Sequence, residues 1–445
     1  MNLKKLLALA MAAVLCLALL AGCSSTSSST PAPADPASAD STTPDAEPAP
    51  APADEEVTIT VATWDYTSND SVKNGVEAFM DANPNIKVEI LDIPSADYNT
   101  KLNTMLNGGS DMDVFFIKEA SSTPDLVAKG QLLDLTDFIA RDNVDMSAYN
   151  GTDTPFNFDG HQYGMPARTD IYVLFYNKDL FDAANVEYPS NDMTWEEFED
   201  LAMEMSGDGV YGAHFHTWTA CVLNWAVQDG KHTIMDYETG YEFFKPSYEM
   251  VLRLQDAGAI QDFADLDANG IHYSGAFAAG NVAMMPMGSW YMATIINAIN
   301  NGEANVKEWG VATLPHPSDV SAGYTVGATT PLAINPASEK QEAAWEFVKF
   351  MSGEEGAMGY AATGSLPGRI NDEVLAEIGA MDGMPEGVVD ALKVANIAPD
   401  RPLLPNVTEV DAAQGRTHKL IMLKEVTVDE GIAMMVEEVE GILNS

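Results

Sequence analysis

The sequence predicts an α/β fold in which a mixed, mostly parallel sheet is flanked by helices. From residue 57 onward, short apolar runs alternate with segments whose apolar residues recur every three or four positions, as expected for alternating strands and helices. The predicted strands are continuous apolar runs, which is typical of strands that helices cover on both faces. A chain of 445 residues is also long enough for two or three domains.

The first predicted elements alternate regularly. The β-branched segment VTITVATW predicts a strand, and apolar residues at 72–80 lie on one face of a following helix that stops at NPN. The strand IKVEIL, the helix YNTKLNTMLNGG, the strand DVFFI and a helix around PDLVAKGQLL come next. Because binding sites in such sheets lie at the carboxyl ends of strands, we expect Trp64, Asp65 and Glu119 at one rim.

A second unit is predicted to begin near residue 165. MPARTDIYVLFYNKDLF contains a strand with alternating aromatics, and TWEEFEDLAMEM predicts a helix with Thr194 as its N-cap and Glu197 three residues later. Strand and helix patterns continue to WGVATLP near residue 310. TTPLAINP, the helical segment EKQEAAWEFVKFM and the turn GSLPGR then lead into a largely helical C-terminal region.

The N-terminus has the features of a bacterial secretion signal. Lys4 and Lys5 precede an apolar run at 6–21, which is shorter than the ~20 residues of a transmembrane helix. The run closes on LAGC, which resembles the lipobox of bacterial lipoproteins, whose cysteine, here Cys23, is diacylated; the alternative is an ordinary signal peptide with an incidental cysteine. Residues 24–56 are only Ser, Thr, Pro, Ala, Asp and Glu, which predicts an extended linker.

The composition is strongly acidic. The chain has 22 basic and 67 acidic residues, and loss of Lys4 and Lys5 with the signal would change the net charge from −45 to −47. Such a surface repels phosphate backbones, which excludes a nucleic-acid partner, and it favours a neutral or cationic ligand over an anionic one. With Cys16 removed and Cys23 acylated, Cys221 has no disulfide partner and is predicted to be a small buried hydrophobic residue.

Three short motifs are better explained by structure than by chemistry. The glycines of GDGVYG at 207–212 follow a helix and precede a strand, the reverse of a dinucleotide site, so they are expected to end the helix and turn the chain. DLDANG at 265–270 resembles the start of a calcium loop, but position twelve is Ala276, so we predict a metal-free loop. His214 and His216 have no third ligand at a recognisable spacing. We therefore expect no metal, no cofactor and no catalytic site.

The stretch AGNVAMMPMGSWYM combines a predicted buried strand with a candidate binding residue. Its methionines are expected to fill the core. Trp290 follows Gly288 and Ser289, two small residues that let another group approach the backbone closely. The spacing alone leaves a core role and a binding role for Trp290 equally open.

From residue 57 to the C-terminus, the chain resembles the family 1 extracellular solute-binding proteins of the carbohydrate-import type, the family of maltose-binding protein. The resemblance rests on the order and spacing of DVFFIKEA…GQLLDLTDFI, YGMPARTDIYVLFYNKDLF…TWEEF, FAAGNVAMMPMGSW, WGVATLP and AAWEFVKFM. It implies a two-lobe periplasmic-binding-protein fold of type II, with three hinge crossings and lobes that close over a ligand in the cleft.

The resemblance also implies the boundaries of the domains. The crossings are placed near Arg168 to Asp170, Gly327 to Thr330 and Gly364 to Arg369. The expected domains are a signal peptide at 1–22, the lipidated Cys23 with its linker at 23–56, an N-terminal lobe at 57–168 plus 330–365, and a C-terminal lobe at 169–329 plus 366–445.

A carbohydrate site is implied as well. The apolar face of a pyranose stacks on an aromatic plane, while carboxylates and Arg bind its hydroxyls. Trp290 aligns with the stacking Trp of the family, Asp170 falls where maltose-binding protein has a cleft carboxylate, and Lys118 and Glu119 fall near its charged pair after the third strand. The implied ligand-binding residues are Trp64, Asp65, Lys118, Glu119, Arg168, Asp170, Trp218, Gly288, Trp290, Tyr324 and Arg369, and Trp218 or Trp225 would add a second stacking surface.

By this resemblance, the protein is a monomeric, lipid-anchored receptor on the extracytoplasmic face of the bacterial cell membrane. It would capture a mono- or short oligosaccharide and present it to an ABC permease without making or breaking a bond. Residues 400–430 contain no Trp or Tyr where maltose-binding protein supplies a stacking aromatic, which favours a sugar other than a maltodextrin, or a shorter one. The alternatives are a polyamine or other cation held by Asp65, Glu119 and Asp170, and a secreted glycosidase.

Overall fold

The structure is a computed structural model that describes residues 56–68, 70–149 and 151–444. These residues belong to one compact unit. The predicted signal peptide at 1–22, the lipidated Cys23 and the linker up to residue 55 lie outside the described residues. Within the described part of the chain, no helix is both long enough and apolar enough to cross a membrane.

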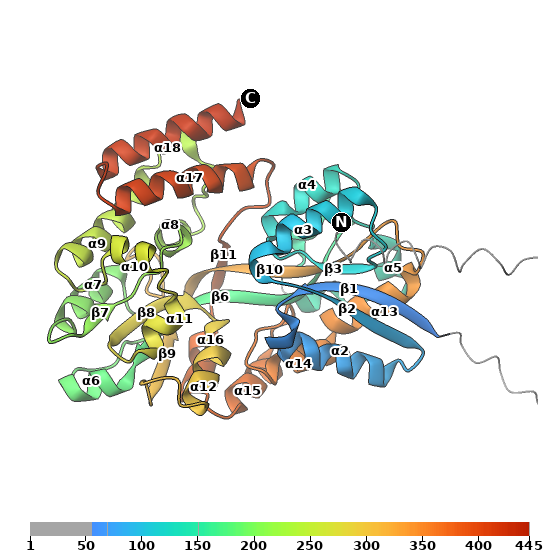
Figure 1. Cartoon of the computed structure of the whole chain (residues 1–445), viewed down its shortest axis with the longest axis horizontal. Coiled ribbons are helices and arrows are strands. Elements are labelled where there is room, and N and C mark those ends of the chain that lie inside the picture. Colours follow the sequence, from blue (N-terminus) through green and yellow to red (C-terminus); the bar gives the residue numbers. More distant parts are fainter. Residues whose placement is uncertain (1–55, 69, 150, 445) are drawn as a thin grey trace, which may run out of the picture. The chain divides into compact units, whose positions relative to one another are not determined.

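A nine-stranded mixed sheet runs through this unit in the order β2-β1-β3-β10-β6-β8-β7, with β11 paired to β10 and β9 paired to β6. The β1–β2, β1–β3, β7–β8 and β10–β11 ladders are parallel, whereas β10 is antiparallel to β3 and β6, and β6 is antiparallel to β8 and β9. Helices flank both sides of the sheet, as Figure 1 shows, and the predicted fold class is confirmed. The strands are β1 (Val57–Trp64), β2 (Ile86–Ile93), β3 (Val114–Phe116), β6 (Met165–Asn177), β7 (Tyr211–Ala213), β8 (Val282–Gly288), β9 (Trp309–Thr313), β10 (Tyr324–Ile334) and β11 (Asn396–Pro399), and β4 (Asn157–Phe158) and β5 (His161–Gln162) form a small hairpin.

The helices occupy the positions between strands that the periodicity predicts. Before β6 lie α2 (Asp70–Ala82), α3 (Tyr98–Gly108), α4 (Thr123–Ala128) and α5 (Thr136–Arg141). Between β6 and β10 lie α6 (Lys178–Ala184), α7 (Trp195–Glu204), α8 (Ala220–Val227), α9 (Lys245–Asp256), α10 (Phe263–Asn269), α11 (Tyr273–Ala278) and α12 (Tyr291–Asn300). The C-terminal region is largely helical, as expected: α13 (Gln341–Ser352), α14 (Glu354–Ala361), α15 (Asp372–Ala380), α16 (Val388–Leu392), α17 (Val407–Met422) and α18 (Val428–Leu443).

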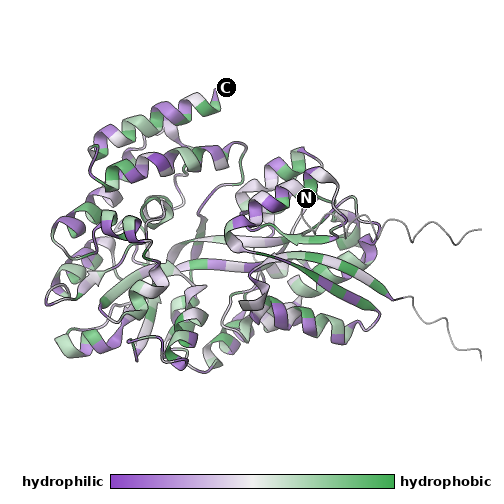
Figure 2. Cartoon of the chain, viewed as in Figure 1, coloured by the Kyte–Doolittle hydropathy of each residue, from purple (hydrophilic) through white to green (hydrophobic). Residues whose placement is uncertain are grey.

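The strands bury apolar side chains on both faces. Every residue of β8 and all but one residue of β6 are buried. Figure 2 shows hydrophobic residues along the strands and mixed hydrophobic and hydrophilic residues around the outer helices, which is the pattern of amphipathic helices on a covered sheet. Cys221 is buried and unpaired, as the sequence predicts.

Three segments run side by side through the middle of the sheet. The first residues of β6 pair with β10, and its last residues pair with β8 and β9. In this register Ala328 of β10 faces Asp170 of β6. The segment 364–369 lies along the other edge of β6, where the N–H of Thr169 donates to the carbonyl oxygen of Leu366 at 3.0 Å. The structure thus brings together the three segments that we expect to be hinge crossings.

Buried side chains form hydrophobic clusters that divide the sheet into two halves. Two of the clusters consist of residues between Ile59 and Ala167 together with residues of β10, α13 and α14. The other two consist of residues from Ile171 onward. On β10 the change falls between Val326 and Leu332. The predicted boundaries at 168/169 and 329/330 lie within these intervals, whereas Ala357 and Ala361, just before the third predicted boundary, pack in a cluster of the second half. The lobe division itself stays a prediction.

Two local predictions about helix α7 are confirmed. The side chain of Thr194 accepts a hydrogen bond from the N–H of Glu197, and the two residues form a complete capping box. Gly207 and Gly209, with φ angles of 125° and 87°, then turn the chain from α7 toward β7. Positive φ angles of this kind cost glycine little, which explains the GDGVYG motif without a dinucleotide.

The DLDANG prediction is wrong, because this segment is helical. It lies in α10 and ends at Gly270, which is in the left-handed conformation. The carboxylate of Asp262 accepts a hydrogen bond from the N–H of Ala264 at 2.9 Å and caps the helix. Phe263 and Leu266 are buried, so packing of one face outweighs the turn propensity of the Asp, Asn and Gly residues.

Candidate ligand-binding site

Trp64 lies at the end of β1 close to two cationic side chains. Lys118 Nζ lies 5.7 Å and the Arg168 guanidinium carbon 5.8 Å from the centroid of its ring. The ring also makes an edge-on contact with Tyr98, at a centroid distance of 5.2 Å. Cations over an indole face are attracted by its negative electrostatic potential, so Trp64 and the two cations hold one another in place.

Arg168 and Asp170 form an ion pair on the crossing strand β6. Arg168 Nε lies 2.9 Å from Asp170 Oδ2, and the side chains are 20% and 9% exposed. Residues two apart on a strand share a face, which is why the pair forms within one strand. Burial raises the pKa of Asp170, and Arg168 and Ser289 act in the opposite direction. The carboxylate is therefore held in a poorly solvated position where it would gain from a hydroxyl donor.

Lys118 joins the segments that follow β2 and β3. Its Nζ donates to the carbonyl oxygen of Ser95 at 2.7 Å and to its Oγ at 2.6 Å, and the N–H of Ser95 donates to Asp65 Oδ1 at 3.0 Å. Burial lowers the pKa of Lys118, while Glu119 and Asp65 raise it. Asp65 has a φ of 49°, a conformation that an Asp side chain tolerates better than most. The structure thus brings Trp64, Asp65, Lys118 and Glu119 to one rim.

Trp290 begins the second group of site residues. Its ring packs edge-on against Tyr172 at a centroid distance of 5.4 Å, and its Nε1–H donates to the hydroxyl of Tyr273 at 3.0 Å. Trp290 is half-buried, so its ring is neither sealed in the core nor free in solvent. We expected a ligand to approach the backbone of Gly288, but the indole of Trp290 itself fills that space.

Trp218 extends this aromatic group toward solvent. Its ring lies 5.3 Å from Tyr273 and 4.6 Å from His216, measured between centroids, and the residue is 41% exposed. Trp225 is only 2% exposed and packs against Tyr172 in the core. Of the two tryptophans, Trp218 is therefore the one available to a ligand.

Ser289 connects the Trp290 group to the Arg168–Asp170 pair. Its N–H donates to the carbonyl oxygen of Ile171 at 2.8 Å, and its Oγ accepts from the N–H of Ile171 at 3.2 Å. It also hydrogen-bonds to the carboxylate of Asp170. One crossing strand therefore holds charged groups beside Trp64 and aromatic groups beside Trp290.

Two predicted residues make their contacts elsewhere. The guanidinium of Arg369 lies 5.7 Å from the ring centroid of Tyr149. Tyr324 begins β10, where its carbonyl oxygen accepts from Gln228 Nε2 at 2.7 Å. These contacts do not join either residue to Trp64, Asp170 or Trp290.

The sequence did not single out Tyr172 and Tyr273, which pack against or hydrogen-bond to Trp290. Tyr172 lies two residues after Asp170 on the same strand, so strand periodicity could have indicated its direction. Tyr273 begins α11, directly after the segment that we predicted to be a loop, and no pattern indicated its contact with Trp290.

A cavity of about 670 Å³ lies beside the crossing segments, and none of the predicted ligand-binding residues lines it. Thr169, Ala328, Thr329 and Gly368 form part of its wall. Thr169 is next to Asp170 in sequence and therefore points to the opposite face of β6. Ala328 also lines the cavity and pairs with Asp170 in the β6–β10 ladder, so the lining includes residues from both faces of the crossing strands.

His214 and His216 follow β7 in the chain. Nδ1 of His214 lies 2.8 Å from Gln261 Oε1, and burial lowers the pKa of both His214 and His216 to about 4. In residues 56–444, apart from the two undescribed positions, no three His, Cys, Asp or Glu side chains are placed to hold a metal ion.

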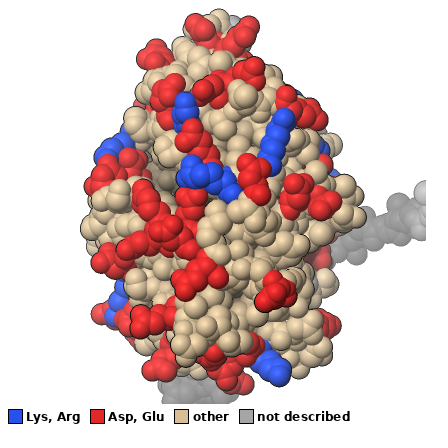
Figure 3. All heavy atoms as spheres, turned by 90° about the vertical axis from the view of Figure 1, so that its left-hand side faces the viewer, with Lys and Arg blue, Asp and Glu red and all other residues tan. Residues whose placement is uncertain are grey.

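The acidic composition is visible on the surface. Figure 3 shows that Asp and Glu cover much more of the viewed face than Lys and Arg. In the candidate site, by contrast, acidic and basic groups alternate, since Lys118 and Arg168 lie among Asp65, Glu119 and Asp170.

Comparison with known proteins identifies similar chains. Residues 63–358 match the family described as bacterial extracellular solute-binding proteins. The diacetylchitobiose binding protein DasA of Streptomyces coelicolor is 26% identical over 280 residues, which are 60% of this chain and 63% of that protein. This alignment thus spans less than two thirds of the curated relative.

Two solved structures match over most of their length. A sugar transporter of Rhizobium etli in an open conformation is 37% identical, with a TM-score of 0.78 over 86% of this chain and 99% of that one. An ABC substrate-binding protein of Listeria monocytogenes in complex with cycloalternan is 25% identical, with a TM-score of 0.73 over 88% of this chain and 100% of that one.

Proposed function

The chain belongs to the family of bacterial extracellular solute-binding proteins, and we propose that it captures a mono- or short oligosaccharide for an ABC transporter permease. Support for a carbohydrate comes from the similar proteins, which include a sugar transporter, a diacetylchitobiose binding protein and a complex with cycloalternan. The family places such proteins outside the cytoplasm. We further propose that the solute is bound and released unchanged.

The observation that carries the proposal is the position of the Arg168–Asp170 pair between two tryptophans. Trp64 packs against the guanidinium of Arg168, and Ser289 links Asp170 to the strand end that carries Trp290. An indole offers a face to the C–H side of a pyranose, and a carboxylate and a guanidinium can each bind two adjacent hydroxyls. A sugar that bridges these groups would contact both predicted lobes.

Closure of the lobes follows from the same arrangement. The residues on either side of the site belong to different hydrophobic clusters, and β6, β10 and the segment 364–369 are the connections between them. A ligand that contacts both sides favours the closed arrangement by the difference between its affinities for the two states. We propose hinge motion at these three segments, with lobes at 57–168 plus 330–365 and 169–329 plus 366–445.

A cationic ligand is the less favoured alternative. It requires the carboxylates of Asp65, Glu119 and Asp170 to form an acidic cleft, but Lys118 and Arg168 already lie among them. A polyamine would have to displace these cations or tolerate their repulsion. The charge balance of the site thus favours a neutral ligand.

Membrane attachment through Cys23 completes the proposal. The LAGC sequence would direct diacylation of this cysteine, and the linker would separate the binding domain from the membrane. We expect a monomer. Mass spectrometry of the protein purified from a bacterial membrane fraction would show a diacyl modification on Cys23, and an unmodified N-terminal peptide containing residues 1–22 would contradict this part of the proposal.

The solute can be tested by thermal unfolding of the full-length protein in the presence of single sugars. A panel should include N,N′-diacetylchitobiose, cycloalternan, maltose and several monosaccharides, with spermidine as the cationic alternative. A ligand that binds only the folded state raises the melting temperature in proportion to the logarithm of its concentration. A saturable shift with a sugar is expected. A shift with spermidine alone, which disappears at high salt, would instead support the cationic alternative.

A further inference from the structure

The cavity beside the crossing segments has the size and the lining of a small-molecule site. Its volume of about 670 Å³ falls within the ~300–1,000 Å³ of typical ligand pockets. Its walls come from both halves of the sheet: Tyr149 and Phe156 precede β6, while Leu392 and Ile397 belong to the C-terminal region. The three crossing segments contribute the remaining wall through residues such as Thr169.

Asp400 is the main polar group on this wall. Its backbone N–H donates to the carbonyl oxygen of Gly327 at 3.0 Å, which fixes the residue against β10. The neighbouring Arg401 directs its guanidinium to Asp411 and to Asn224, and donates to the carbonyl oxygen of Asp400 rather than to its carboxylate. The Asp400 carboxylate accepts a hydrogen bond from the backbone N–H of Arg401, while the guanidinium of Arg401 is directed to other partners.

The surroundings of Asp400 make its carboxylate a strong acceptor. Burial raises its pKa to about 6, Arg401 acts in the opposite direction, and Asp411 and Asp170 raise it further. A desolvated carboxylate of this kind gains more from a hydroxyl donor than a solvated one does.

The other walls indicate a neutral solute. The charged residues that line the cavity are Asp372, Lys393, Asp400 and Arg401, two of each sign. Apolar side chains such as Phe156, Leu375 and Ile397 cover much of the remaining surface. A cavity wall with equal numbers of acidic and basic residues, the Asp400 carboxylate as a hydrogen-bond acceptor, and apolar patches fits a small ring that has hydroxyl groups and C–H faces.

We propose that this cavity is a second solute site, which binds a small neutral polyhydroxylated ring through Asp400. It is separate from the candidate sugar site, because its lining contains neither Trp64, Asp170 nor Trp290. The proposal does not depend on the identity of the sugar that the first site binds.

The test uses myo-inositol as the probe in isothermal titration calorimetry with the full-length protein at pH 7.5. Saturable binding to the wild type is expected. Asp400→Ala should weaken it about tenfold or more, as for loss of a charge-assisted hydrogen bond, and Asp400→Asn should retain part of the affinity. Asp372→Ala is the matched control, because its carboxylate lies on the same cavity but is 95% exposed. It should change the affinity less than twofold.

Two further variants separate this site from the first one. Ala395 lines the cavity from an exposed position, so Ala395→Trp should obstruct the cavity and abolish inositol binding without disturbing the core. Trp290→Ala should leave inositol binding unchanged. The inference is overturned if the wild-type protein does not bind inositol, or if both Asp400→Ala and Ala395→Trp bind it normally. It is also overturned if Trp290→Ala abolishes inositol binding, because the probe would then occupy the sugar site. Failure of the sugar panel with intact inositol binding would instead overturn the proposed carbohydrate function.

Discussion

The indole of Trp290 lies directly over the α-carbon of Gly288. A β-carbon at Gly288 would come within 1.9 Å of Cζ3 of this ring, so no larger residue fits while the ring keeps its position. The hydrogen bond from Nε1 to Tyr273 fixes the far side of the same ring. Gly288 thus positions Trp290, and the two residues act as one feature of the site.

Gly288→Ala is therefore expected to weaken sugar binding although residue 288 need not touch the sugar. The added methyl group must displace the indole, which would lose its place against Tyr172 and Tyr273. We expect the affinity for the sugar identified in the panel to fall about tenfold and the free energy of unfolding to fall by about 1–3 kcal/mol, as for overpacking. Calorimetry and urea denaturation measure the two effects. Gly441→Ala is the control, since its β-carbon would meet open space.

Trp290→Ala removes the proposed stacking surface itself. Truncation of a buried aromatic anchor typically costs about 2 kcal/mol or more, which corresponds to about thirtyfold in affinity. Trp225→Phe is the matched control, because Trp225 is a core residue in the same half of the molecule. This control should lower stability but leave sugar affinity unchanged. Near-normal affinity of Trp290→Ala would remove this tryptophan from the site.

The fold could be predicted from the sequence wherever burial follows a simple period. β1 and α2 occupy the segments that their apolar patterns indicate, and the Thr194 capping box marks the start of α7. The prediction of a loop at 265–270 was wrong, because turn-forming residues occur there inside helix α10. There the burial of Phe263 and Leu266 decides the conformation, and contacts between distant segments are not visible in local composition.

The candidate site could be predicted only in part, and for a related reason. Asp170 and Trp290 lie in motifs that resemble a family, and the structure brings them together through Ser289. Tyr273 had no such motif, since its contact with Trp290 depends on how α11 packs. Arg369 was placed by its proximity to a crossing segment, but position in the chain does not fix the direction of a long side chain, which lies over Tyr149.

The buried His418 predicts a loss of stability in mildly acidic solution. Its Nδ1 lies 3.0 Å from the hydroxyl of Tyr248, and burial lowers its pKa to about 4. The unfolded chain, with a His pKa of about 6.5, binds one more proton between these two pH values, so the free energy of unfolding falls as the pH decreases through this range. The contribution of one such residue is at most about 1.4 kcal/mol per pH unit.

His418→Leu should remove this contribution to the pH dependence. Urea denaturation at pH 7, 6 and 5 should give a smaller loss of stability on acidification than in the wild type, although the variant is less stable at pH 7 because it lacks the contact with Tyr248. If the free energy of unfolding depends on pH in the same way in the wild type and in His418→Leu, then His418 is already protonated in the folded state or titrates equally in the folded and unfolded states.

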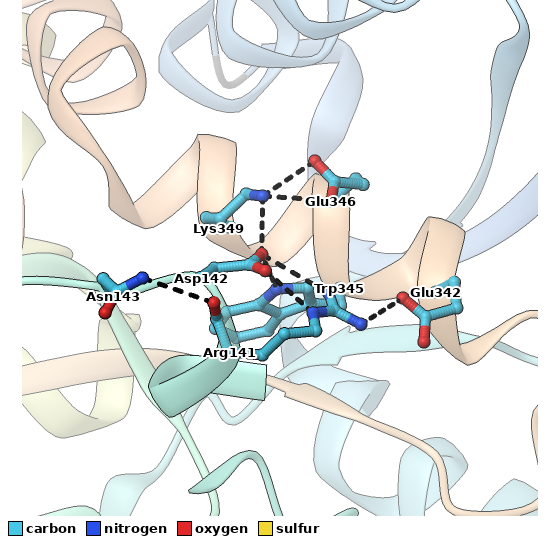
Figure 4. Close-up of polar contacts among 7 residues, drawn as sticks. All are labelled: Arg141, Asp142, Asn143, Glu342, Trp345, Glu346 and Lys349. Carbon is cyan, nitrogen blue, oxygen red and sulfur yellow. Dashed lines mark hydrogen bonds and ion pairs between the residues drawn. The ribbon is translucent and has the colours of Figure 1, made fainter. Parts of the chain in front are cut away.

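Asp142 ties the end of helix α5 to helix α13, as Figure 4 shows. Its carboxylate accepts hydrogen bonds at 2.8 Å from Arg141 Nε, from Lys349 Nζ and from Trp345 Nε1. Arg141 also donates to Glu342 at 2.7 Å, so the group is a network rather than an isolated pair. These donors, with Arg141 as the largest influence, hold the pKa of Asp142 well below its usual range.

Asp142→Asn should destabilise the protein at neutral pH and change its response to acid. The amide cannot satisfy two cationic donors and the indole N–H of Trp345 at once, which should cost about 1–3 kcal/mol at pH 7. Because the folded pKa of Asp142 is depressed, its stabilisation is present above the unfolded pKa of about 3.9 and is lost as the pH falls further. Urea denaturation at pH 7 and pH 3 should therefore show a difference between variant and wild type that shrinks in acid. Glu437→Gln, at an exposed carboxylate, is the control and should match the wild type at pH 7. An equal difference at both pH values would mean that Asp142 acts through packing rather than through its charge.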